Sequence, residues 1–123
     1  MVVESFYENV KLHASERREL RAGEPEQNIV LQFTPNPPQT MLIACLWSHW
    51  TDPKEPDVRG FAAITDEPPS DVAAAGHDRC IINLRPEHLD AWLTPEGRST
   101  RELQSILSDH AVSTYQHQAL EAA

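Results

Sequence analysis

The chain has 123 residues, of which 40% are hydrophobic and 24% are charged, as expected for one ordinary globular domain spanning residues 1–123. Its formal net charge of −9 argues against nonspecific nucleic-acid binding by the chain as a whole, because phosphate neutralisation needs clustered Lys and Arg. The longest apolar run, residues 41–47, is far shorter than the roughly 20 residues of a membrane span, and the amino-terminal segment lacks the features of a signal peptide. These observations predict a cytoplasmic protein.

The first half of the chain predicts four strands separated by polar segments. They are Val2–Glu8, Asn28–Thr34, Met41–Trp47 and Phe61–Thr65. The segment 11–26 is polar and indicates an exposed excursion with one or two helical turns. Met41–Trp47 is apolar on both faces, which favours a central strand. Residues 48–60 contain two prolines and one glycine and are typical of a polar loop.

The second half predicts helices around one further strand. A short helix over Ser70–Ala75 has Ser70 as a plausible N-cap and ends at Gly76. The remaining predicted elements are a strand at Cys80–Leu84, a proline-started helix at Pro86–Leu93, a helix at Thr100–Leu107 capped by Ser99 or Thr100, and a last short strand at 112–115. Strands followed by late helices indicate an α+β fold with a mixed, mainly antiparallel sheet and short peripheral helices.

The two cysteines, Cys45 and Cys80, lie inside apolar segments and are expected to be small buried hydrophobic residues without a disulfide. Five Cys and His residues occur between positions 45 and 88, but their spacing lacks the CxxC or HxxxH of zinc sites. The sequence therefore predicts neither a metal nor a cofactor.

The sharpest chemical feature is His77-Asp78-Arg79, where a loop leads into a strand. A histidine at such a position can act as a general acid or base near neutral pH. Glu8, next to Phe6 and Tyr7 at the end of the first predicted strand, is a second candidate, because burial beside aromatic rings raises the pKa of a carboxyl group. We expect Glu8 and His77 to face one shared pocket.

Each candidate also has a purely structural interpretation. Asp78 and Arg79 could pair with neighbours and fix the turn, and a glutamate at the end of a strand is usually exposed and inert. Trp47, Trp50 and Trp92 could stack on nucleic-acid bases, although tryptophans in a domain of this size mostly belong to the core and its rim. The residues alone leave these alternatives open.

Four motifs in order resemble the SOS-response-associated peptidase (SRAP) family of abasic-site processing proteins. That family typically shows "DGFYEW", "AGLWE.W", "F.I.T" and "HDRMPVIL", followed by a helix with "W-L". The corresponding positions here are Glu4–Asn9, Ala44–Trp50, Phe61–Thr65, His77–Leu84 and Trp92-Leu93. The similarity covers nearly the whole chain and corresponds to the C-terminal part of the family domain.

The resemblance implies a partly barrel-like, bifurcated sheet, here incomplete, and a role in the SOS response and DNA repair. Family members bind single-stranded DNA at abasic sites and join it covalently, with lyase and thiol-type peptidase activities. Carried over by position, Glu8 and His77 assist opening of the sugar ring and Schiff-base chemistry. Arg79 is expected to contact a phosphate or anchor the turn, and Trp47 is a candidate DNA contact. In a bacterium such a protein would be associated with the nucleoid.

The sequence departs from the family pattern at several positions. The family nucleophile is an N-terminal cysteine whose amine and thiol close on the sugar aldehyde as a thiazolidine, whereas Cys45 and Cys80 are internal. Asn9 stands where the family has tryptophan, and Cys80-Ile81 replaces Met-Pro. The chain is thus expected to be a truncated abasic-site protein that does not crosslink by itself and that self-associates or requires a missing N-terminal half.

Two readings other than an active abasic-site protein stay open. The first is a non-catalytic remnant that binds DNA or a partner protein. The second is an unrelated hydrolase with a His77–Cys80 dyad, which the expected burial of Cys80 disfavours.

Overall fold

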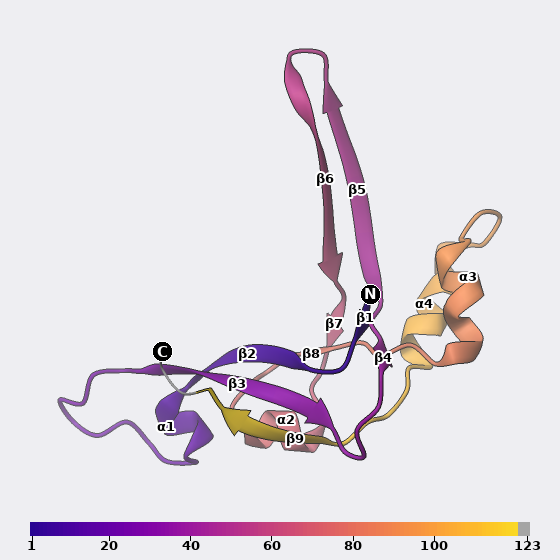
Figure 1. Ribbon diagram of the computed structural model, residues 1–123. Helices are drawn as coiled ribbons and strands as arrows, with labels where there is room; N and C mark the ends of the chain where they lie inside the picture. The colour runs from indigo at the N-terminus through magenta and orange to yellow at the C-terminus, as the bar shows by residue number, and fades with distance from the viewer. Residues whose placement is uncertain (121–123) are drawn as a thin grey trace. The chain divides into compact units, whose positions relative to one another are not determined.

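The computed structural model describes residues 1–120, and these residues form two compact units (Figure 1). The sheet unit consists of residues 2–41, 66–80 and 112–120, and the hairpin unit consists of residues 1, 42–65 and 81–111. Each unit has its own buried core, and each is described separately below.

Most of the described elements are short, and strands predominate in the first half of the chain. The strands are β1 (Val2–Val3), β2 (Phe6–Lys11), β3 (Asn28–Pro35), β4 (Met41–Leu42), β5 (Cys45–Asp52), β6 (Glu55–Ala63), β7 (Thr65–Asp66), β8 (Cys80–Ile81) and β9 (Tyr115–Ala119). The helices are α1 (Leu12–Ser15), α2 (Ser70–Ala74), a 3-10 turn (Pro86–His88), α3 (Leu89–Leu93) and α4 (Thr100–Ser108). None of these described helices is long and apolar enough to cross a membrane.

The sheet unit contains an antiparallel sheet in the order β2-β3-β9, whose strands lie side by side in Figure 1. Alternate residues of β2 and β3 face the core, because successive side chains of a strand point to opposite faces. Phe6 pairs with Phe33 and their rings stack at 5.1 Å, while the ring of Tyr115 from β9 meets Phe6 edge-on at 5.3 Å. This aromatic cluster, with Phe33 fully buried, anchors the three strands.

The hairpin unit contains the long antiparallel pair β5–β6 and the helices α3 and α4 (Figure 1). Its core is a cluster of Ala44, Ile82, Leu84 and Ile106, against which Trp92 and other half-buried residues pack. The two strands of the hairpin are exposed over most of their length, with Trp47 at 74% and its cross-strand partner Phe61 at 69%.

The predicted α+β class is confirmed, and all the strand pairings that connect β2, β3, β5, β6 and β9 are antiparallel. Within residues 1–120 the strands are distributed over four small sheets, none of them closed into a barrel. The predicted strand at 28–34 and the helices at 70–75, 86–93 and 100–107 agree with the structure to within a few residues. The predicted strand at 61–65 is divided between the end of β6 and β7, and the one at 80–84 is reduced to β8. Both cysteines are free, and Cys80 is buried as predicted, but Cys45 is only half-buried.

Three predictions about the strands are wrong. The first strand divides into β1 and β2, and β2 continues past Glu8 to Lys11 because its pairing with β3 extends to Asn28. The segment 41–47 is not a central strand, since it splits at Ile43 and its second part enters an exposed hairpin. The predicted loop at 48–60 forms the arms of that hairpin, with the chain reversing between Asp52 and Glu55.

Two further predictions are wrong in detail. Ser70 is the first residue of α2 and does not cap it, because the N-cap position is taken by Pro69. The last strand begins at Tyr115, where it pairs with Pro35, instead of at 112.

Helix α4 begins with a capping box at Ser99, one of the two residues predicted as its cap. The backbone N–H of Glu102 donates to Ser99 Oγ at 3.3 Å, and the backbone N–H of Ser99 donates to Glu102 Oε2 at 2.7 Å. These bonds satisfy two backbone donors that a helix start otherwise leaves unpaired.

Replacing Ser99 with alanine should lower the free energy of unfolding by about 1 kcal/mol, because the cap would be lost. Urea unfolding followed by circular dichroism measures this change. Ser108→Ala is the matched control, because Ser108 lies at the other end of α4 and its hydroxyl only donates to the Gln104 carbonyl. Equal effects of the two substitutions would contradict a special role for the cap.

Candidate active site

Glu8 is the third residue of β2, and its side chain lies on the core face of the sheet unit. Phe6 and Val10, two residues before and after it, are both buried, and its cross-strand partner Leu31 is only 3% exposed. The strand alternation therefore places a carboxyl group among apolar side chains. Burying an ionised carboxylate is costly unless a partner compensates for the lost water.

His77 supplies that partner from the turn that follows α2. Gly76 donates its backbone N–H to Ala73 O at 3.0 Å, and His77 donates its own to Val72 O at 3.3 Å. This pair of bonds is the Schellman arrangement that closes a helix C-terminus. The end of α2 thereby fixes the position of the His77 backbone, from which the imidazole extends.

The two predicted site residues are brought together in the sheet unit. His77 Nε2 lies 3.1 Å from Glu8 Oε2, and the side chains are only 19% and 23% exposed. The contact joins residues 69 positions apart in the sequence, so the tertiary fold creates it.

The backbone at Arg79 determines which nitrogen of His77 faces Glu8. Nδ1 lies 2.7 Å from the carbonyl oxygen of Arg79, and because a carbonyl oxygen can only accept, this contact requires a proton on Nδ1. The N–H of Arg79 also lies 3.3 Å from Nδ1, but the shorter contact decides the tautomer. Nε2 is then the nitrogen that faces the carboxyl group of Glu8, and a hydrogen bond between the two needs one further proton on either Nε2 or the carboxyl oxygen.

The surroundings of Glu8 shift its affinity for protons. Burial raises the pKa of the Glu8 carboxyl group, the charge of His77 lowers it, and the charge of Asp78 raises it again. Burial is the largest of the three causes. A carboxyl group that retains its proton more readily and touches an imidazole suits proton transfer in either direction.

Arg79 and Cys80, which follow His77 in the chain, have different environments. Arg79 is exposed at its side chain and contributes its backbone to His77. Cys80 is buried at 4% exposure, which does not suit a nucleophile that must be reached by substrate. No group of three or more His, Cys, Asp or Glu side chains that could hold a metal ion occurs in the described part of the chain.

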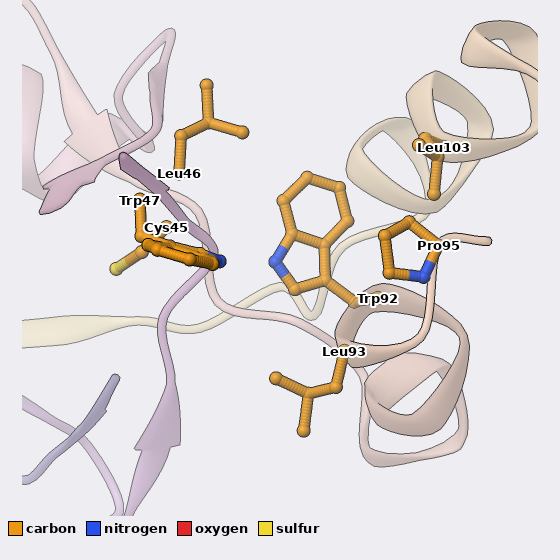
Figure 2. Close-up of a pocket in the computed structure, with 7 residues that line it drawn as sticks. All are labelled: Cys45, Leu46, Trp47, Trp92, Leu93, Pro95 and Leu103. Carbon is orange, nitrogen blue, oxygen red and sulfur yellow. The ribbon is translucent and has the colours of Figure 1, made fainter. Parts of the chain in front are cut away.

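Trp47, the second predicted DNA contact, belongs to the hairpin unit. It lines an apolar pocket of about 280 Å³ together with Cys45, Leu46, Trp92, Leu93, Pro95 and Leu103. Figure 2 shows the two indole rings pointing toward one another across this pocket. An exposed indole beside such a pocket provides a flat apolar surface that an unpaired base can stack on.

A comparison with protein families identifies the chain. The family model described as "SOS response associated peptidase (SRAP)" matches residues 1–122. The chain belongs to the SRAP family. Searches of curated proteins and of solved structures give no significant match.

SRAP membership associates the chain with DNA damage and with the processing of abasic sites at the level of the family. It also gives DNA as the general class of partner. Glu8 and His77, which the sequence motifs select, are the residues that the fold brings into contact.

The sequence-based prediction placed Glu8 wrongly within its strand and did not identify the contact of the Arg79 carbonyl with His77. Glu8 was expected at a strand end, but it lies within β2, and its burial comes from alternation with Phe6 and Val10. The role of the Arg79 carbonyl had no sequence signal, because any residue at that position has a carbonyl group.

Substitutions of its two charged neighbours should move the pKa of Glu8 in opposite directions. Asp78→Asn should lower it, because the Asp78 charge disfavours a second negative charge, and His77→Gln should raise it, because the attraction of the imidazolium is lost. Carbon-13 NMR of the Glu8 carboxyl carbon across a pH series measures both. Asp90→Asn, a substitution in α3, is the control. A shift of the same sign in both site variants would contradict the assignment.

Proposed function

We propose that this chain is an SRAP-type protein that binds abasic sites in single-stranded DNA, and that Glu8 and His77 transfer protons at the exposed sugar. The observation that carries the proposal is the 3.1 Å contact between Glu8 and His77 at two positions where the sequence resembles the family's motifs. The geometry supports acid–base chemistry, and family membership supports the substrate class.

An abasic sugar reacts as its open-chain aldehyde. Opening the ring takes a proton from the anomeric hydroxyl and gives one to the ring oxygen. Addition of an amine then forms a carbinolamine, and loss of water, which needs a proton on the departing hydroxyl, gives the imine. A carboxyl–imidazole pair that shares one proton can donate and accept at each of these steps.

The covalent step needs an aminothiol to form a thiazolidine. Cys45 and Cys80 are the two cysteines among the 123 residues, and neither has a free α-amine beside its thiol. We therefore propose that Glu8 and His77 supply acid–base catalysis within these 123 residues, and free L-cysteine is a convenient aminothiol probe of that role.

Arg79 and Trp47 are the proposed DNA contacts. Arg79, an exposed residue two positions after His77, carries a guanidinium group, which suits a phosphate. Trp47 suits a base, because stacking on an indole needs no particular base sequence. The alternative is a non-catalytic module that binds DNA without accelerating any reaction, and a rate measurement separates the two.

The chain should accelerate the reaction of free cysteine with an abasic single-stranded oligonucleotide. Glu8→Gln and His77→Asn should each reduce the protein-dependent rate about 100-fold, the usual magnitude for loss of a general acid or base. Mass spectrometry of the modified oligonucleotide measures the rate, and fluorescence anisotropy measures binding separately.

His49→Asn is the matched control, because His49 also contacts a carboxylate, Asp57 Oδ2, at 3.0 Å but lies on the exposed hairpin. Without cysteine, no heat-stable band should appear on a denaturing gel. Such a band, or unchanged rates in both site variants, would contradict the proposal, and binding without any acceleration would favour the non-catalytic module.

The exposed hairpin supports a further proposal, that the chain associates with a second copy of itself. Both faces of β5–β6 carry exposed apolar side chains, among them Leu46, Trp47, Val58 and Phe61. An isolated two-stranded hairpin is marginally stable in water, and apolar patches of this kind drive association.

We expect dimers or larger species at micromolar concentration by analytical ultracentrifugation, because association would cover these apolar side chains. The double substitution Trp47→Ser and Phe61→Thr should shift the distribution toward monomer. A monomeric wild-type chain at these concentrations would rule out this association.

A further inference from the structure

Gly76, the residue before His77, has a backbone conformation that other residues rarely adopt. Its φ angle is +95°, in the left-handed region where a side chain is strained and glycine is not. The Schellman bonds of Gly76 and His77 require this conformation at the residue that follows Ala75, the C-cap of α2.

Gly76 also rests against α1 with no space for a side chain. A Cβ atom placed on Gly76 would lie 3.0 Å from Ala14 Cβ, and 3.3 Å from both the carbonyl carbon of Ala14 and the amide nitrogen of Ser15. Two of these three neighbours are backbone atoms, which cannot rotate away. Helix α1 is itself held, because Leu12 donates its N–H to Gln27 O at 2.9 Å at the base of β3.

Helix α1, against which Gly76 packs, follows directly in the chain from the strand that carries Glu8. Strand β2 carries Glu8 and runs directly into α1, which carries Ala14. The turn that leads to His77 therefore packs against the same β2–α1 segment that carries the Glu8 carboxylate. We propose that the Gly76–Ala14 contact is the positioning device that places the imidazole of His77 against Glu8.

This inference rests on the proposed function for its effect on rate, but not for its effect on the Glu8–His77 contact. Gly76→Ala adds the Cβ atom, so the turn and α1 must separate by a few tenths of an ångström, and the positive φ angle becomes strained. Ala14→Val crowds the same contact from the α1 side and leaves the glycine in place, so it serves if Gly76→Ala fails to fold.

In both variants the pKa of Glu8, measured by carbon-13 NMR on the folded protein, should rise toward that of His77→Gln, because the charge of His77 lowers it in the wild type. For the reaction of free cysteine with the abasic oligonucleotide, kcat should fall about 10- to 100-fold with little change in KM. A displacement of a catalytic group by up to about 1 Å can cause such a loss. Adding Ala14→Gly to Gly76→Ala should recover part of both effects, because it removes the closest of the three contacts.

Gly23→Ala is the matched control, since Gly23 has a φ angle of +79° but nothing within 4 Å of an added Cβ. It carries the same backbone strain without the contact, so its Glu8 titration should match the wild type. If the titration of Glu8 is unchanged in folded Gly76→Ala and Ala14→Val, the inference is overturned. If the wild type shows no protein-dependent rate, the proposed function fails, whereas the NMR comparison still decides the positioning role.

Discussion

Glu8 lies between Phe6 and Val10 on the core face of β2, opposite Leu31, and the organisation of the candidate site follows from the cost of placing a carboxyl group there. An ionised carboxylate in apolar surroundings must be neutralised or paired. The sheet unit does both in part, since burial raises the pKa of Glu8 and His77 stands 3.1 Å away.

The support for His77 comes mainly from backbone atoms. The end of α2 fixes the start of the turn, the carbonyl of Arg79 holds Nδ1, and Gly76 allows close approach to α1. Asp71 adds a tie from α2 to β9, because its carboxylate accepts the backbone N–H of Tyr115. A site held by rigid, well-packed neighbours keeps its geometry better than one held by mobile side chains.

The two units have different surface chemistry. The sheet unit buries its aromatic cluster and leaves the Glu8–His77 pair partly exposed. The hairpin unit, in contrast, exposes the aromatic side chains of Trp47 and Phe61 on β5 and β6. Exposed indole and phenyl rings promote aggregation of an isolated chain, whereas at an interface they contribute binding energy. The net charge of −9 disfavours nonspecific binding to DNA phosphates, whereas stacking of a single base on an exposed indole depends little on charge.

The fold class, most of the helices and the family could be predicted from the amino-acid sequence. Ser99 with Glu102, Gly76 after an alanine run, and the proline at position 86 are local signals, because capping and chain reversal depend on residues within one or two turns. The motifs around Glu8 and His77 likewise selected both candidate residues without any coordinates.

Where those residues meet, and which strands are buried, depends on contacts between distant parts of the chain. The pairing of Lys11 with Asn28 extended β2 beyond Glu8, and the pairing of β5 with β6 alone left Trp47 exposed. Strand pairing and burial depend on segments far apart in the chain, whose apolar patterns are compatible with several partners. The contact between Glu8 and His77, and the seat of Gly76 on Ala14, exist because β2, α1 and α2 fold into one unit.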